Sequence, residues 1–436
     1  MSQLASTIEV KVPGRATPDE IFRINSARET ALSRLLMLYI GTGLFFMLLP
    51  GTFLGVWNLI AISSHRVADS VSPAWVQAHG HAQIFGWIGT FILGIGFYSI
   101  PKLRHSNFGL WVEGAAWALW ISGVALRWLA NVYLWHWRIL LPLSAILELA
   151  AFLIFFRTVS GHRPQDSSKG KLDDWIFVVI AGTVGLLLAL SLNFGTTIRL
   201  AIRGVSPAVG ADFDQSFLVL QAWGSLVPFV WGFSAKWLPV FLGLQPVRGR
   251  ALWLAVALNS LGVLGSFLYW AKVAALLLFS GVGVAIHALN LLRAPVRPAK
   301  IKGVHGTFPT FVRLAYAWAL VAATLGVWAA AVENAHGIAG ASRHALTVGF
   351  LAMMVFAIGQ RVLPAFAGSF LFSTKLMFTS LALLTAGCLL RVSAEILAYQ
   401  GFLHSAWSWL PISAIAETTA VTVFAINLIV SFARKF

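Results

Sequence analysis

Long apolar stretches alternate with short polar breaks along almost the whole chain. Each stretch holds about 20 mostly apolar residues, enough for an α-helix to cross a hydrocarbon core of about 30 Å. The sequence therefore predicts an all-α, polytopic membrane protein with about twelve spanning helices. We expect them near residues 35–62, 79–101, 109–126, 137–157, 175–198, 215–243, 251–270, 273–293, 310–332, 343–364, 376–397 and 409–433.

The composition agrees with a membrane protein. The 436 residues are 58% hydrophobic and 11% charged, whereas soluble globular proteins carry about 25% charged residues. This excludes a soluble enzyme. The single cysteine, Cys388, excludes an intrachain disulfide and argues against an iron–sulfur cluster. The first 30 residues lack the apolar core of a signal peptide, so we expect residues 1–30 to form a cytoplasmic tail.

The basic residues are distributed unevenly between the two sides of the membrane. With twelve spans both termini lie on one side, and that side then holds 23 of the 31 Lys and Arg residues, against 8 on the other. The positive-inside rule therefore predicts cytoplasmic N- and C-termini. Because these basic loops are short and next to the membrane, the net charge of +16 indicates contact with membrane lipid and no nucleic-acid partner.

Two polar breaks are longer than the rest and divide the chain into three blocks of four helices. They run from Ser160 to Asp174 and from Ala294 to Pro309. We therefore expect three four-helix arcs within one membrane domain, at residues 31–160, 161–303 and 304–436.

A related pattern marks the second helix of each block. The segments His81 to Pro101 and His344 to Pro364 both have alanine after the histidine, glycine five positions after it and proline twenty positions after it. In the middle block, the segment Val219 to Pro239 keeps the glycine and the proline but has valine in place of histidine. Repeats in membrane proteins usually form related bundles with sites between them. We therefore expect His81 and His344 to face each other near the extracytoplasmic end.

Two neutral imidazoles on either side of a slot are what a six-coordinate b-type haem requires as axial ligands. The alternatives are a metal ion without haem and interhelical hydrogen bonding, and the repeat favours haem ligation by His81 and His344. Glycines on the first of these helices would let a flat macrocycle approach the backbone, but small residues serve helix packing equally well. They are Gly86, Gly89, Gly94 and Gly96.

Other polar residues are predicted on the same side. Haem propionates need cationic partners, and Arg343, Arg127 and Arg391 are the candidates, unless they extend to lipid headgroups. The buried acids Glu148 and Glu417 suggest a proton path but do not establish a relay.

Two further histidines are weaker candidates. His79 precedes His81 by two residues, so it points to another side of the helix and cannot share one ligand with it. It is a candidate for a second metal such as copper, or it faces the outer interface. His136 lies between two tryptophans, where an aromatic belt at the membrane surface is the favoured interpretation and a second metal the alternative.

Several segments together resemble the NnrS family. These are HGHAQIFGWIGTFILGIGFYSIPKL at 79–103, LAYAWALVAATLGVWAA at 314–330, HALTVGFLAMMVFAIGQRVLPAFAG at 344–368 and LLR at 389–391. The resemblance implies a bacterial inner-membrane protein that binds haem and copper and acts in the nitric oxide response. The family has Glu after its H-x-H motif, whereas this sequence has Ala82 and Gln83, and Gln360 and Arg361 also depart from the pattern.

A more distant resemblance is to subunit I of haem–copper oxidases and nitric oxide reductases. There three four-helix arcs place the axial ligands of the low-spin haem on helices two and ten, where His81 and His344 are expected. The binuclear centre of that superfamily needs further histidines on helices six, seven and ten. This sequence has Val219, Gln221, Ser342 and Leu346 at or near those places, so that centre cannot form.

The resemblances imply a haem protein acting in nitric oxide metabolism or resistance to nitrosative stress. Nitric oxide or another diatomic molecule is its expected ligand, and a quinol or a cytochrome its expected electron donor. Two alternatives stay open. One is a divergent nitric oxide or oxygen reductase subunit, and the other is a transporter of metal, haem or ions. Whether the protein is an enzyme is not decided by the sequence.

Overall fold

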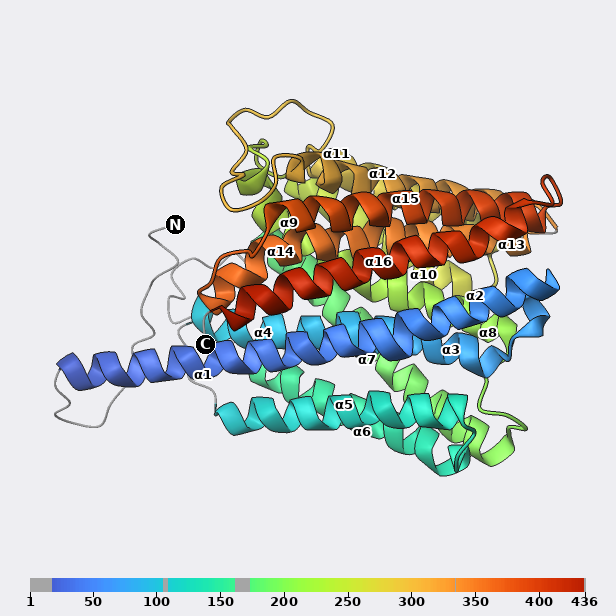
Figure 1. The fold of residues 1–436 in the computed structure, drawn as a ribbon, viewed down its shortest axis with the longest axis horizontal. Coiled ribbons are helices and arrows are strands. Elements are labelled where there is room, and N and C mark those ends of the chain that lie inside the picture. Colours follow the sequence, from blue (N-terminus) through green and yellow to red (C-terminus); the bar gives the residue numbers. More distant parts are fainter. Residues whose placement is uncertain (1–17, 105–108, 161–172, 334, 435–436) are drawn as a thin grey trace.

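The structure, a computed structural model, describes residues 18–104, 109–160, 173–333 and 335–434. Within these residues all regular structure is helical, and the helices run along one long axis as an elongated bundle (Figure 1). The predicted all-α membrane fold is confirmed. Residues 1–17 of the predicted tail lie outside the described residues, and helix begins at Pro18, well before the expected start of the first span.

Several long helices contain a π-helical segment (η) and carry two or three labels. In chain order the helices are α1 (Pro18–Phe46) with η2 (Met47–Phe53) and α2 (Leu54–His65); α3 (Pro73–His81) with η4 (Ala82–Gly89) and α4 (Thr90–Arg104); α5 (Leu110–Val132); α6 (Trp137–Ser160); α7 (Asp174–Arg203); α8 (Ala211–Val219) with η5 (Leu220–Leu226) and α9 (Val227–Phe241); α10 (Gly249–Phe267); α11 (Ala271–Ala288); α12 (Phe308–Ala331); α13 (His336–His344) with η6 (Ala345–Ala352) and α14 (Met353–Ala367); α15 (Thr374–Tyr399); and α16 (Ala406–Ala433). A short 3₁₀ turn, η3 (Ala68–Ser70), precedes α3.

Eleven helices of the described residues are long and apolar enough to cross a membrane. The remaining long helix is α5, which has the buried charged residues Glu113 and Arg127. Large apolar side chains are exposed on the outside of the bundle. For example, Leu254, Leu261 and Leu264 lie along one stripe of α10 and are about half exposed. Such a surface is suited to lipid and not to water.

The same packing scheme occurs three times along the chain. The first helix of each group packs against the second (α1 on α4, α7 on α9, α12 on η6 and α14), and the third packs against the fourth (α5 on α6, α10 on α11, α15 on α16). The groups are joined where α6 meets α7 and where α11 meets α12. Contacts of α16 with α2 and η2 close the arrangement, so the first and third groups are neighbours (Figure 1).

The second helix of every group becomes π-helical at the same place. Segments η4, η5 and η6 begin directly after His81, Val219 and His344, the three equivalent positions of the sequence repeat. A π-helical segment shifts the hydrogen-bond ladder by one residue and often occurs at functional sites. The repeat is therefore structural, and its register is the one the sequence predicts.

The packing of α7 against η5 gives a test of the fold. A Cβ atom on Gly185 would lie 1.9 Å from the carbonyl oxygen of Gly224, whereas one on Gly195, also in α7, would meet nothing within 4 Å. We expect Gly185→Ala to destabilise the protein by about 1–3 kcal/mol, because it overpacks this contact. The measurement is the midpoint of thermal unfolding in detergent. Gly195→Ala should leave the midpoint unchanged, and equal midpoints for both variants would contradict the packing.

Candidate functional site

The two predicted haem ligands end equivalent helices at the same end of the bundle. His81 is the last residue of α3 and His344 is the last residue of α13, and both helices lie at the end where α2 ends and α16 begins (Figure 1). The His81 side chain is 6% exposed and that of His344 is 28% exposed. Both imidazoles therefore lie at the same position of their groups, largely inside the protein.

His81 is bound to an acid from the fourth helix of its own group. Its Nε2 atom lies 2.7 Å from Oε1 of Glu148 on α6, and the Glu148 side chain is fully buried. The ring of Phe85, one turn further along, lies 4.6 Å from the imidazole ring. A hydrogen bond to a buried carboxylate is strong, so the orientation of the imidazole is well defined.

A glycine and an arginine of α5 complete the surroundings of Glu148. A Cβ atom on Gly123 would lie 2.6 Å from Cγ of Glu148, so the acid packs directly on the glycine backbone. One turn later Arg127 is close enough to interact electrostatically with Glu148, and its Nη1 donates to Oδ1 of Asn193 on α7 at 3.3 Å. Arg127 Nε, Glu148 Oε2 and Asn193 Nδ2 are buried without a hydrogen-bond partner. A bound molecule or water would satisfy them.

His344 is held by groups from α13 and α15. Its Nδ1 lies 3.0 Å from the carbonyl oxygen of Gly340 and 3.1 Å from Oε2 of Glu395. Its Nε2 lies 3.5 Å from Nη2 of Arg391, at the limit of a hydrogen bond. Arg391 Nε is also 3.5 Å from Glu395 Oε2. The fourth-helix acid, Glu417, interacts electrostatically with His344 and Arg391, but the described contacts include no hydrogen bond between it and the imidazole.

These contacts show a second repeat that our sequence reasoning missed. The segments from Leu141 to Glu148 and from Leu410 to Glu417 both read LP-x-SAI-x-E, and the segments from Gly123 to Arg127 and from Gly387 to Arg391 both read G-x-x-L-R. The structure places them equivalently, because a Cβ atom on Gly387 would lie 2.7 Å from Cγ of Glu417. A comparison of the third and fourth helices of the outer groups would have found this signal in the sequence.

The middle group keeps the shape of this arrangement and loses its polar residues. There Gly262 packs on Leu278, whose Cγ would lie 2.8 Å from a Cβ atom on the glycine. Leu278 therefore takes the place of the glutamate, and Ser266, four residues after Gly262, takes the place of the arginine. With Val219 in place of the histidine, the histidine, arginine and glutamate are all absent together. The three residue types therefore occur together in the outer groups and are absent together from the middle group.

His79 and His81 point to different helices, as their spacing predicts. Nδ1 of His79 lies 2.8 Å from the carbonyl oxygen of Gly51 in η2, and a Cβ atom on Gly55 would lie 2.6 Å from its Cε1. The described contacts include no hydrogen bond to its Nε2. His344 and Arg391 are close enough for their charges to act on His79. His79 therefore lies on the side of the helix that faces the third group.

The remaining two predicted site residues, Arg343 and His136, have different surroundings. Nη1 of Arg343 donates to Oε1 of Gln215 on α8 at 2.7 Å, and the neighbouring Asp214 interacts electrostatically with both Arg343 and Arg127. His136 is exposed in the turn between α5 and α6. In the described part of the chain no three His, Cys, Asp or Glu side chains are grouped so as to hold a metal ion.

Three of the four glycines noted in the sequence serve helix packing. Cβ atoms on Gly86, Gly89 and Gly94 would lie 2.5–2.9 Å from side-chain atoms of neighbouring helices. Further from the histidines, the rings of Trp87 and Phe356 lie 6.2 Å apart between the second helices of the outer groups. The space between these helices is therefore filled by aromatic side chains below the level of the histidines.

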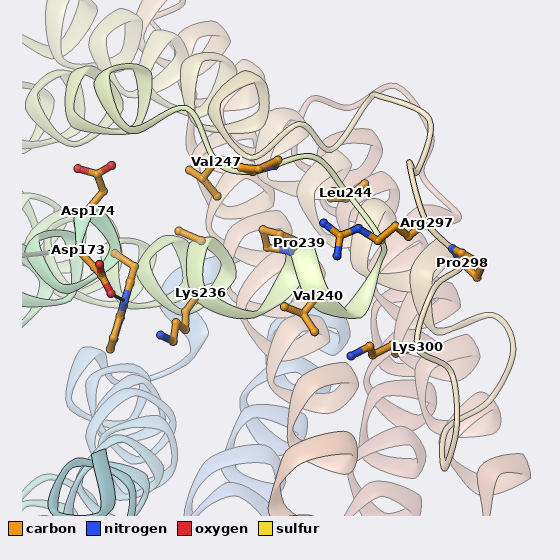
Figure 2. A pocket seen from close by; sticks show the side chains of 14 residues that line it. Asp173, Asp174, Lys236, Pro239, Val240, Leu244, Val247, Arg297, Pro298 and Lys300 are labelled. Carbon is orange, nitrogen blue, oxygen red and sulfur yellow. Dashed lines mark hydrogen bonds between the residues drawn. The ribbon is translucent and has the colours of Figure 1, made fainter. Parts of the chain in front are cut away.

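A surface cavity of about 470 Å³ lies at the other end of α9 and contains none of the predicted site residues (Figure 2). Lys236, Arg297 and Lys300 line it together with Asp173 and Asp174. Both acids already accept hydrogen bonds from tryptophan indoles at 3.0–3.1 Å. The cavity is thus distinct from the histidine site.

Comparisons with known proteins identify the fold. No protein-family model matches the sequence, and no curated protein sequence does. Among solved structures, a chain of a haem–copper terminal oxidase dimer determined by cryo-electron microscopy is similar. The TM-score is 0.56 at 12% identity, over 92% of this chain and 84% of that chain. This chain has a haem–copper oxidase-like fold. The predicted distant resemblance is therefore confirmed at the level of fold, and membership of the NnrS family stays a prediction.

Within this oxidase-like fold, Gly340 and Glu395 give a test of the contacts around His344. A Cβ atom on Gly340 would lie 1.9 Å from Oε1 of Glu395. We expect Gly340→Ala to displace the carboxylate and to lower the free energy of unfolding. In a double-mutant cycle, Gly340→Ala should cost less in a Glu395→Ala background, with a coupling energy of about 0.5–3 kcal/mol. The measurement is the unfolding midpoint of the four proteins, and strict additivity would show that the two residues are not in contact.

Proposed function

We propose that this chain is a haem-binding membrane protein, with a b-type haem held by His81 and His344. The observation that carries the proposal is that three residue types are either all present or all absent in a group. Histidine, arginine and glutamate occur together in the two outer groups and are all replaced in the middle group, within an oxidase-like fold.

The side chains present suit a haem in their chemistry. Metal-binding histidines usually donate their other ring N–H to a carboxylate or a backbone carbonyl. His344 does so through Nδ1, and His81 is bound to Glu148 through Nε2, which leaves Nδ1 as its second nitrogen. Arg127 and Arg391 have buried side-chain nitrogens without hydrogen-bond partners, which suits them to propionate groups. When bound, the haem would supply one-electron chemistry.

We further propose that the protein acts in nitric oxide metabolism or in resistance to nitrosative stress, in a bacterial inner membrane with both termini cytoplasmic. The segments similar to the NnrS family and the positive-inside charge distribution support this part. A quinol or a cytochrome is the proposed electron donor, and copper is a proposed second metal.

A divergent nitric oxide or oxygen reductase is the second candidate, because the fold is that of an oxidase. Two observations weigh against a reductase with the usual binuclear centre. The position before η5 is Val219 and the next polar residue is Gln221. In addition, the described residues contain no cluster of three metal-ligating side chains.

His79 is an alternative to His81 as the second haem ligand beside His344. It interacts electrostatically with His344 and carries its hydrogen bond on Nδ1, the arrangement that His344 also has. Single-residue variants separate the two possibilities, since only the true ligand is required for haem binding.

The test is the reduced-minus-oxidised optical spectrum of the detergent-purified protein, recorded with and without CO and NO. We expect the spectrum of a six-coordinate b-type haem, and we expect His81→Ala and His344→Ala to lose it while the protein stays folded. His404→Ala, an exposed histidine in the turn before α16, should retain it. If haem is lost in His79→Ala and kept in His81→Ala, the ligand is His79 and not His81.

The same spectra decide between the candidate functions. Bands that shift with CO would indicate an open iron position and favour the reductase. A purified wild-type protein without haem, and unable to take it up when haem is added, would overturn the proposal.

A further inference from the structure

We propose that Glu148 is a positioning residue for His81, which it holds in one orientation and one tautomer. The role of His81 as a ligand rests on the proposed function above. The hydrogen bond between His81 and Glu148 does not. Nε2 of His81 and Oε1 of Glu148 are 2.7 Å apart, and the two side chains are 6% and 0% exposed. When Glu148 is ionised, its oxygens can only accept a hydrogen bond, and Nε2 of His81 then carries the proton. Nδ1 is then the nitrogen whose lone pair is available to a metal.

Packing alone does not explain the glutamate. All three groups place a side chain on the glycine of the third helix, with Cγ 2.6–2.8 Å from the position of a Cβ atom. In the middle group this side chain is Leu278, which fills the place without any polar group. A carboxylate buried in a membrane protein is costly, and the polar partner that Glu148 has is Nε2 of His81, at 2.7 Å.

The third group shows what happens when the imidazole takes a different partner. Nδ1 of His344 lies 3.1 Å from Oε2 of Glu395, an acid of the third helix, and the described contacts include no hydrogen bond from it to Glu417, the equivalent of Glu148. The position equivalent to Glu395 in the first group is Asn131, whose amide donates to the carbonyl oxygen of Ala74. Each imidazole therefore has one carboxylate, supplied by the fourth helix for His81 and by the third helix for His344. Glu417 has the motif of Glu148 without its contact, which makes it the matched control.

The first measurement does not depend on haem. Full-length protein labelled with ¹⁵N-histidine is reconstituted in lipid and measured by magic-angle-spinning NMR, with the His81 signals assigned by their loss in His81→Gln. We expect a protonated Nε2 in the wild type and a changed set of His81 signals in Glu148→Leu. Glu417→Leu should leave the His81 signals unchanged. Unchanged signals in Glu148→Leu, or an unprotonated Nε2 in the wild type, would overturn the proposal.

The second measurement is haem retention and the reduction potential. Removal of such a hydrogen-bond partner typically lowers metal affinity by about 10–100-fold, and we expect this loss in Glu148→Leu. In Glu148→Gln, which keeps a hydrogen-bonding group but no charge, we expect haem to be retained with a higher potential. If Glu148→Leu does not fold, Glu148→Gln carries the test through its potential and its His81 signals.

The results separate this proposal from the proposed function. Wild-type protein without haem contradicts the proposed function, and the NMR result still decides whether Glu148 positions His81. Haem that is lost in His81→Ala, yet bound with wild-type affinity and potential in Glu148→Leu and Glu148→Gln, contradicts positioning while the haem proposal stands.

Discussion

Polar side chains buried inside a membrane protein depend mainly on partners within the protein, because lipid supplies none. Arg127 and Arg391 are 4% and 8% exposed, and each lies beside a glutamate of its own group. Charged side chains can be buried here only where the second, third and fourth helices approach closely enough to place opposite charges next to each other. The glycines of the third helices make that approach possible, since Gly123 and Gly387 leave room for a glutamate against the backbone.

The same requirement joins the three groups at one end of the bundle. Arg127 of the first group bonds Asn193 of the second, and Arg343 of the third bonds Gln215 of the second. Asp214 interacts with both arginines. Nearer the other end the outer groups meet through aromatic side chains, as with Trp87 and Phe356. The end with the histidines therefore contains the two buried arginines and their partners, and the aromatic contacts further along the bundle supply rigid packing.

Much of the fold can be read from the sequence, because apolar runs of membrane length and a proline-ended repeat are strong signals. The register of that repeat, with His81, Val219 and His344 as equivalents, is the register at which the helices become π-helical. The π-helical geometry itself has no comparably clear signal in composition or spacing. The partners of the histidines were also missed, because Glu148 and Glu395 are far from them in sequence and belong to different helices of their groups. The motif LP-x-SAI-x-E was readable, but only the packing of Gly123 and Gly387 shows what it does.

The oxidase-like fold limits the possible chemistry less than the side chains do. A fold shared at 12% identity shows how the helices are arranged, and function depends on the groups placed on them. Here the middle group has lost its histidine, arginine and glutamate while keeping the close helix packing around Gly262. The close helix packing therefore forms without the polar residues. The histidine, arginine and glutamate of the outer groups, by contrast, depend on that packing. The two outer groups keep both, and they meet along α2 and α16. Any cofactor bound by both histidines must consequently lie where the first and third groups adjoin, with the middle group contributing shape and the partners of two arginines.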